Sequence, residues 1–351
     1  MAIKFTKLKP SSPNSNKGFT LVELLVTTLI ASVVLGLSLG LITDQRKQFV
    51  SDQVRSQSNQ TLRVGMDMVG TDIKNTGDFL QSDINLPVVT VINGTSGGSD
   101  QLILQRKLIA DSLTVCENVN AGSKTTIKVA IKPGNTDCPV YSDGDGDNLT
   151  DALTLAQRER CEQDNTEGCS RTSGPPATGT CDNECVWAYI YDPVHQEGEF
   201  FQYSFEEPDS TTNPTFNQIH VGGAATFTNT YEVANKPVIY LIEKRHYSLN
   251  NNVLQLSVND QPALLLVNQV EDFQVQAKLT NNTSLQTSFN DTASANEAST
   301  YVQTTDWQSL EYLQVDVESV DPSESELTAV KNADQLKLSS RFFPRNALSQ
   351  D

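Results

Sequence analysis

One carboxylate interrupts the most apolar segment of the chain. Within residues 19–42 the only charged side chain is that of Glu23, five residues after Gly18. A charge at bilayer depth costs roughly 2.5–3.5 kcal/mol on insertion scales, and residues that carry this cost are usually functional. Glu23 therefore indicates a role that needs a negative charge in an apolar environment.

The stretch YSDGDGDNLTDAL, residues 141–153, alternates aspartate and glycine in a way that is typical of a calcium loop. Small residues let the chain wrap hard oxygen ligands around one ion, as in an EF-hand. Position 6 of the loop holds Asn148 in place of glycine, and position 12 holds Thr154 in place of the bidentate glutamate, for which Glu159 or another acid could substitute. A solvated acidic turn is the alternative to Ca²⁺ binding. The predicted ligands are Asp143, Asp145, Asp147, the carbonyl of Leu149, and Asp151.

All six cysteines fall between Cys116 and Cys185. An even number of cysteines after a membrane segment favours disulfides formed outside the cytoplasm. Cys181 and Cys185 could instead form half of a zinc site, but the other cysteines are widely spaced and the three histidines are isolated. Local pairings are preferred: Cys116–Cys138, Cys161–Cys169 and Cys181–Cys185.

The charge of the chain argues against nucleic acid as a partner. The formal net charge is −18 over 351 residues, and no run of Lys and Arg forms a local basic patch. No catalytic set stands out, because His195, His220 and His246 have no carboxylate or nucleophile partner at an obvious spacing. No nucleophile elbow or phosphate loop is recognisable in the sequence either. We therefore expect a protein that is not an enzyme.

The order of the N-terminal segments differs from that of a secretory signal peptide. Residues 1–18 contain four lysines and no acid, and they precede the apolar run, so that their removal would leave the run in place and change the net charge to −22. Residues 19–42 span roughly 36 Å as a helix, enough to cross a bilayer. The lysines keep the N-terminus in the cytoplasm and place the rest of the chain outside.

The helical pattern continues after the span, over residues 43–80. No proline interrupts it, so one helix is predicted over residues 19–76. Gly65 and Gly70 would weaken its last turns, and Gly77 would end it. Its first half would lie in a membrane or filament core, and a narrow apolar stripe on its second half would pack against a globular head. The stripe consists of Val50, Val54, Leu62, Met66, Val69 and Ile73.

Residues 81–351 are predicted to form a β-rich head, which makes the chain α+β: a long N-terminal helix packed on an antiparallel sheet. The sequence LNNN at 249–252 predicts a tight hairpin. An insertion at about residues 110–185 carries all the cysteines, and disulfides would stabilise it in place of an apolar core. Trp187, Tyr189 and Tyr191 alternate on one strand and are expected in the core, with a sugar-stacking face as the alternative. The predicted strands cover residues 87–92, 101–106, 126–132, 186–191, 199–205, 238–249, 253–258, 263–267, 270–279 and 310–318.

The stretch GFTLVE, residues 18–23, resembles the cleavage and methylation motif of type IV prepilins and of type II secretion pseudopilins. The resemblance implies that a membrane aspartyl peptidase cuts after Gly18 and methylates the new N-terminus at Phe19. Glu23 could then neutralise the charged amine of Phe19, in the same chain or in a neighbouring subunit. The attraction is strong in a low dielectric, and a buried ion pair that fixes register is better attested than one that adds stability. A plain membrane anchor with a chance glutamate is the alternative.

A looser resemblance connects the chain to PilW-like minor pilins, through residues 66–79, 270–276 and 341–348. It implies a subunit that joins, and helps to initiate, a type IV pilus or a related pseudopilus. The implied partners are other pilins or pseudopilins, the prepilin peptidase, an inner-membrane assembly platform and a tip adhesin. The implied location is a single span in the inner membrane with the head outside the cytoplasm, and then the filament. Two alternatives stay open: a secretion pseudopilin, such as those of hormogonium polysaccharide secretion, and a membrane-anchored adhesin or glycan-binding module.

Overall fold

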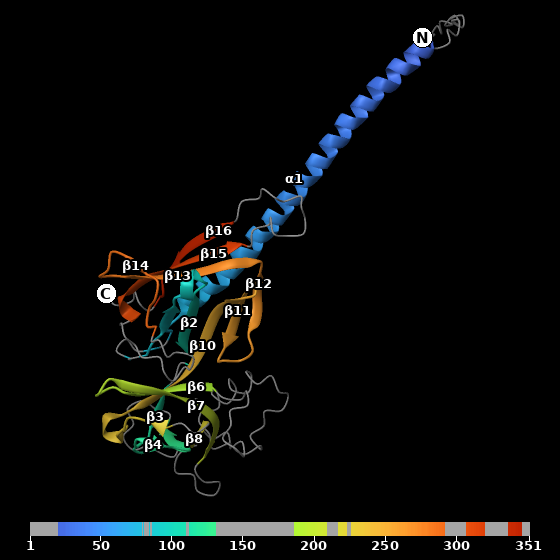
Figure 1. Ribbon diagram of the computed structural model, residues 1–351. Coiled ribbons are helices and arrows are strands. Elements are labelled where there is room, and N and C mark those ends of the chain that lie inside the picture. The colour runs from blue at the N-terminus through green and yellow to red at the C-terminus, as the bar shows by residue number, and fades with distance from the viewer. Residues whose placement is uncertain are drawn as a thin grey trace, which may run out of the picture.

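In the computed structural model, one long helix, α1 (Leu21–Asn75), projects from a β-rich head (Figure 1). The structure describes residues 20–78, 80, 84, 86–109, 112–130, 186–208, 217–222, 226–291, 307–319 and 336–345. Thr20 caps the first turn, and the chain leaves the helix through Thr76 and Gly77. Gly77 has a φ of +73°, a left-handed conformation that favours glycine after a helix. The predicted helix and its stop are confirmed.

The two halves of α1 have different surroundings. The large apolar side chains of residues 21–42 are exposed, whereas the last four members of the predicted stripe are buried against the head. Val50 and Val54 are intermediate in exposure, between the exposed first half and the buried last turns of the helix. The buried members are Leu62, Met66, Val69 and Ile73.

The covered part of α1 packs on two antiparallel sheets. The first runs through β1 (Val89–Ile92), β2 (Gln101–Lys107) and β10 (Val238–Asn250), and continues from β10 to β11 (Val253–Val258) and β12 (Leu264–Asn268). Asn251 and Asn252 join β10 to β11 with φ values of 50° and 61°. Two positive φ values are what a two-residue type I′ hairpin requires, so the hairpin predicted at 249–252 is confirmed.

The second sheet has the order β14 (Leu285–Gln286), β13 (Val270–Leu279), β15 (Leu310–Ser319), β16 (Lys337–Phe342). Opposite residues of β13 and β15 share a face, and the pairs Phe273–Val317 and Val275–Val315 are buried in one core with the helix stripe. The alternate residues form the outer face of the sheet, which points away from this core.

A second hydrophobic core lies in the part of the head farthest from the exposed half of α1 (Figure 1). The long strand β10 enters this part and pairs there with both β3 (Leu113–Val115) and β6 (Val186–Asp192). The order β10-β3-β5-β8-β7-β6 then returns to β10 and closes an antiparallel barrel, which includes β5 (Thr126–Ala130), β8 (Asn217–Gly222) and β7 (Glu197–Pro208). Beside it lie the short pair β4 (Gly122–Ser123) and β9 (Thr226–Phe227) and the turns η1 (Thr95–Gly97), η2 (Val233–Asn235) and η4 (Trp307–Ser309).

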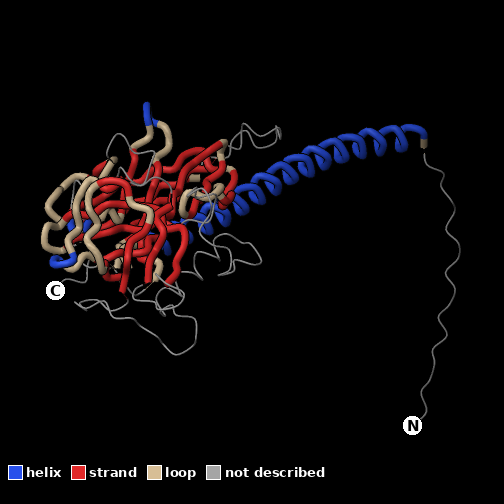
Figure 2. Tube along the Cα trace, turned by 90° about the horizontal axis from the view of Figure 1, so that it is seen from below, coloured by secondary structure: helices blue, strands red, loops and turns tan. Residues whose placement is uncertain are grey.

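The architecture is α+β, as predicted, with the strands gathered in the head and the helix leaving from one side (Figure 2). Residues 112–130, which belong to the predicted insertion, contribute β3, β4 and β5, so this stretch is part of the barrel and its surroundings. Residues 131–185 of the insertion lie outside the described residues.

Candidate functional site

Thr20 and Glu23 close the first turn of α1 through a reciprocal cap. Oε2 of Glu23 accepts hydrogen bonds from the backbone N–H and from the hydroxyl of Thr20, both at 3.1 Å. The hydroxyl oxygen of Thr20 accepts in turn from the N–H of Glu23 at 3.3 Å. This capping box satisfies backbone donors that have no partner within the helix.

The cap determines where the charge of Glu23 lies. The Thr20 N–H belongs to the peptide bond that follows Phe19, so the carboxylate lies at the end of the helix where a cut after Gly18 would create an amine. Gly18 and Phe19 are outside the described residues, and their processing stays a prediction. Thr20 is absent from the sequence-based predictions, although the pattern T-x-x-E before an apolar run is a capping-box signature.

The first half of α1 has the properties of a membrane span. By length and composition α1 is able to cross a membrane, and none of its most apolar stretch is buried in the head. The exposed fraction is 80% for Leu21 and 67% for Leu37. The hydroxyls within this half each donate to a carbonyl three or four residues earlier, as a helix in lipid requires. They belong to Thr27, Thr28, Ser32, Ser38 and Thr43, at distances of 2.7–3.1 Å.

A charged network joins the last turns of α1 to the sheet beneath them. Nη1 of Arg245, on β10, donates to both carboxylate oxygens of Asp72, at 2.9 and 2.8 Å, and its Nε donates to Glu243. The hydroxyl of Tyr247 also donates to Asp72. Arg106, on β2, donates to Glu243 at 3.1 and 2.8 Å. Two strands and the helix are therefore connected through alternating charges.

Arg245 and Tyr247 keep their protons in this network, because the pKa of each is raised. Burial alone would lower the pKa of Arg245, but the hydrogen bonds to Asp72 and Glu243 raise it above its ordinary value. Burial raises the pKa of Tyr247, and the bond to Asp72 raises it further. Removing one partner of such a partly buried pair leaves the other charge poorly solvated. The network therefore holds the helix in one orientation on the head.

Two glycines bring α1 into close contact with the head. A Cβ on Gly65 would lie 2.6 Å from Cγ2 of Val267, and a Cβ on Gly70 would lie 2.1 Å from Cε1 of Phe342. Real Cβ atoms do not approach so closely, so each position requires glycine or a shift of its neighbour. The sequence predicts these glycines as weak points of the helix. The structure adds that the lack of a side chain at each position lets β12 and β16 pack close to the helix.

The alternating aromatic residues at the start of the barrel are mainly core residues. Tyr189 and Tyr191 are 3% and 0% exposed, which confirms the core interpretation for both. Trp187 is partly buried, and its indole N–H donates to Oδ2 of Asp260 at 2.7 Å. A continuous sugar-stacking face is therefore not present on this strand.

His195 has a carboxylate partner that sequence spacing does not suggest. Its Nδ1 lies 2.9 Å from Oδ2 of Asp192, three residues earlier in the same turn. Asp192 also accepts hydrogen bonds from the side chain of Asn235 and from two backbone N–H groups. Burial would raise the pKa of Asp192, but these hydrogen bonds lower it, and the hydrogen bond that His195 donates to Asp192 raises the pKa of His195. The arrangement stabilises a turn.

The other two histidines lie on strands. His220, on β8, packs with its ring centroid 5.6 Å from that of Phe205. Nε2 of His246, on β10, lies 2.8 Å from Oε1 of Gln101, and burial lowers the pKa of His246.

The remaining predicted sites fall mostly outside the described residues. The whole calcium loop does so, with Asp143, Asp145, Asp147, Leu149 and Asp151, as do all cysteines except Cys116. Cys116, directly after β3, is disulfide-bonded, and the pairings preferred from sequence stay predictions. Within the described part of the chain, no group of three or more His, Cys, Asp or Glu side chains could hold a metal ion.

Comparison with known families gives one match. Residues 13–39 match the prokaryotic N-terminal methylation motif, a type IV pilin-type prepilin signal. Comparisons with curated proteins and with solved structures gave no match. The matched segment contains Gly18, Phe19 and Glu23 and ends within the apolar half of α1. It supports a pilin-like or pseudopilin-like precursor, with a membrane anchor and with other pilins and a prepilin peptidase as partners.

Proposed function

We propose that the chain is a PilW-like minor pilin, cleaved between Gly18 and Phe19 and then incorporated into a type IV pilus or a related pseudopilus, whose assembly it helps to initiate. The observation that carries the proposal is a 55-residue helix that begins with a methylation motif and whose apolar half is not packed against its own head. Such a half can lie in the membrane before assembly and among other subunit helices afterwards, since both environments are apolar.

Glu23 has a specific role in this proposal. After cleavage, the amine of Phe19 and the carboxylate of Glu23 would lie at the same end of the helix, where either charge alone is costly in an apolar environment. The cap formed with Thr20 supports this role, because it already directs the carboxylate toward that end. Pairing of the two groups, within a chain or between neighbouring subunits, would define the axial register of the helix in the filament.

The head supports a minor and structural role. It contains two separate cores, one on the helix and one in the barrel, and so large a head is difficult to repeat many times in a narrow filament. We therefore propose a structural subunit and not an enzyme. It would leave the inner membrane through an assembly platform and contact other pilins and a tip adhesin. Binding of Ca²⁺ at residues 143–151 is a separate part of the proposal.

The closest alternative is a pseudopilin of a protein or polysaccharide secretion system, which would use the same helix and the same charge pair. The genes next to this one distinguish the two machines. The alternative of a glycan-binding adhesin receives no support from the aromatic strand, because Tyr189 and Tyr191 are buried.

The intact mass of the full chain, isolated from cells with and without the prepilin peptidase, tests the proposal. The expected product begins at N-methyl-Phe19 and appears only with the peptidase. Gly18→Val should block the cut more strongly than Gly18→Ala, because the site needs a small residue. A chain that keeps Met1, or is cut beyond Ile42, would contradict the pilin assignment.

A further inference from the structure

The outer face of the second sheet has opposite charges at its two ends. At one end Asp272 of β13 lies opposite Glu318 of β15, with Asp316 one position further along the same face. At the other end Lys278 of β13 and Arg341 of β16 lie on either side of β15. On β13 and β15 these residues alternate with buried positions, and Arg341 of β16 pairs with Gln314 on the same face.

The acidic end borders an open cavity of about 450 Å³. Its walls combine carboxylates with the backbone after η1: Glu271, Asp272, Glu318, Gly97, Gly98 and Ser99. The hydroxyl of Ser99 donates to Asp272 at 2.8 Å, which holds the loop against the strand. Among the described residues, Lys337, opposite Glu318 on β16, is the cation that strand pairing places at this end, so the described carboxylates outnumber the described cations here.

The basic end presents preorganised cations. The guanidinium carbon of Arg341 lies 5.0 Å from the ring centroid of Tyr312, a stacking contact that limits the freedom of the side chain. Arg345 is exposed just beyond β16, and Phe343 is 45% exposed with its ring 5.7 Å from Tyr312. Within the described part of the chain, neither Arg341 nor Arg345 forms an ion pair.

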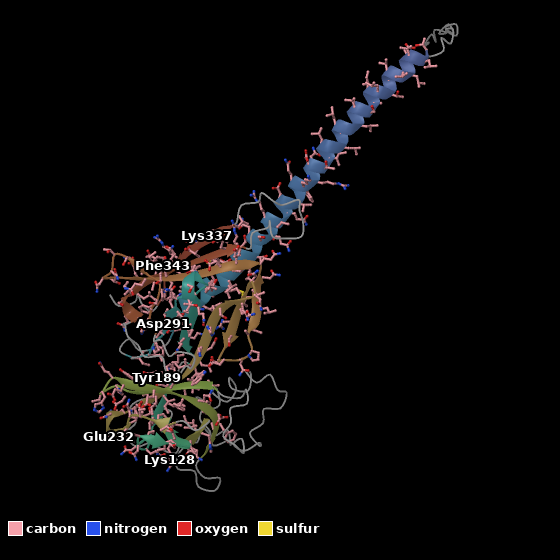
Figure 3. The ribbon with its side chains drawn as sticks, viewed as in Figure 1. Lys128, Tyr189, Glu232, Asp291, Lys337 and Phe343 are labelled. Carbon is pink, nitrogen blue, oxygen red and sulfur yellow. The ribbon has the colours of Figure 1, made fainter. Side chains whose placement is uncertain are left out.

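The two ends are displaced from each other along the direction of α1. Lys337 pairs with Glu318 and Arg341 pairs with Gln314, so four residues of β15 separate the ends, roughly 13 Å. Figure 3 shows that Lys337 lies nearer the exposed half of the helix than Phe343 does. In two parallel copies shifted by about this distance along the helix, the acidic end of one is level with the basic end of the other.

We propose that this face is a contact surface for a second copy of the chain, with the acidic end of one copy against the basic end of the next. The inference rests on the proposed function, because the parallel and shifted arrangement is that of helices in a filament. Unlike ends in contact make a heterologous interface, in which the two copies use different parts of the same face. A contact between a few neighbouring copies is compatible with a minor subunit. Charge complementarity selects the partner: the chain carries a net charge of −18, so copies repel at long range and need local opposite charges to associate.

Charge exchange between copies tests the contact. Two full-length copies with different tags are co-expressed in cells that contain the assembly machinery, and co-purification of the second copy is measured after detergent extraction. One variant reverses the basic end, with Arg341→Glu and Arg345→Glu, and the other reverses the acidic end, with Glu271→Lys and Glu318→Lys. A matched control, Lys124→Glu with Lys236→Glu, reverses two cations near the barrel.

Each reversed variant should lose self-association by about tenfold, since several rim contacts of modest strength are changed at once. Co-expression of the two reversed variants should restore association, and the control should resemble the wild type. High salt should weaken only the wild-type and restored pairs. Thermal unfolding of each variant shows whether its fold is intact, and the restored pair excludes simple misfolding.

Three results would overturn the proposal: wild-type association of the reversed variants, failure of the mixed pair to associate, or loss from filaments with unchanged self-association. The last result would assign the face to a different subunit. N-terminal masses from the same samples separate this outcome from failure of the proposed function. A correctly processed chain with no charge dependence contradicts the contact alone, whereas an unprocessed chain contradicts the pilin assignment.

Discussion

Alanine at position 70 should destabilise the junction of helix and head, and the same substitution should become stabilising once the ring of Phe342 is removed. The reason is geometric. The added Cβ would lie 2.1 Å from Cε1 of Phe342 and 2.6 Å from both Cδ1 and Cζ. Phe342 is held in place by the core on one side and by Lys74, whose Nζ lies 5.9 Å above the ring, on the other.

Two opposing contributions determine how much Gly70→Ala changes the free energy of unfolding. Overpacking of a well-packed site costs about 1–3 kcal/mol. Alanine in a helix interior is more favourable than glycine by about 1 kcal/mol. Gly70→Ala alone should therefore lower the free energy of unfolding by about 0–2 kcal/mol. In a Phe342→Ala background only the helix contribution remains, and the substitution should raise the free energy of unfolding by up to about 1 kcal/mol. The coupling energy between the two sites is then about 1–3 kcal/mol.

Thermal unfolding of the full chain in detergent, for the wild type, both single variants and the double variant, measures this coupling. Trp307 is 1% exposed and its ring approaches Gly77, so its fluorescence reports on the junction. For a chain of this size, 1 kcal/mol corresponds to a shift of about 2 °C in Tm. Gly36→Ala is the matched control, because a Cβ added at Gly36 would have nothing within 4 Å and no coupling with Phe342 is expected.

Equal effects of Gly70→Ala in the two backgrounds would refute this reasoning. The contact with Phe342 would then not limit the approach of helix and head, and the glycine would have to be explained by the helix alone. A stabilising effect in the wild-type background, with no coupling, would have the same consequence.

Three further predictions concern the anchor, the metal and the pH dependence. Glu23→Ala should leave membrane insertion intact, because it removes a costly charge, but reduce the amount of the chain in purified filaments; wild-type incorporation would remove the register role. Ca²⁺ should raise the Tm of the oxidised full chain, by an amount equivalent to about 2.7 kcal/mol at a hundredfold excess over Kd. The shift should be lost in Asp143→Ala and kept in Asp209→Ala, and identical thermal unfolding curves with Ca²⁺ and EDTA would exclude the site. Burial lowers the pKa of His246, so its contribution to stability is complete above about pH 6.5 and is lost as the pH falls toward the folded-state pKa. The decrease in Tm between about pH 7.5 and 5.5 should therefore be smaller in His246→Gln, and an unchanged decrease would contradict this assignment.

The features that follow from local sequence are those that the sequence predicts well. The helix depends on an unbroken apolar pattern, a cap and a stop at Gly77, all of which are contained within α1 and its two ends. The hairpin at 249–252 depends on two asparagines that tolerate positive φ. The long strands bury alternate residues, as β13 and β15 do, and this period is visible in the sequence.

The features that the sequence does not reveal depend on contacts between distant segments. Closure of the barrel requires β10 to pair with both β3 and β6, which lie far from it and from each other in the sequence. The strand β3 has three residues, too few for a clear alternation. The packing role of Gly70 depends on Phe342, and the network at Asp72 depends on Arg245, each far away in the chain. No local pattern specifies such partners.

The rigid junction connects the two ends of the proposed mechanism. The charge of Glu23 would set the axial position of the helix, but a filament contact through the heads requires that this position be transmitted over the length of α1. A continuous helix of 55 residues does so only if its last turns cannot slide or rotate on the head. The hydrogen bonds of Asp72 with Arg245 and Tyr247 oppose rotation, and the close packing of Gly70 on Phe342 opposes sliding. The axial register set at Glu23 and the contact between heads are then coupled through the junction. A substitution that loosens the junction should weaken both, although the junction lies at neither site.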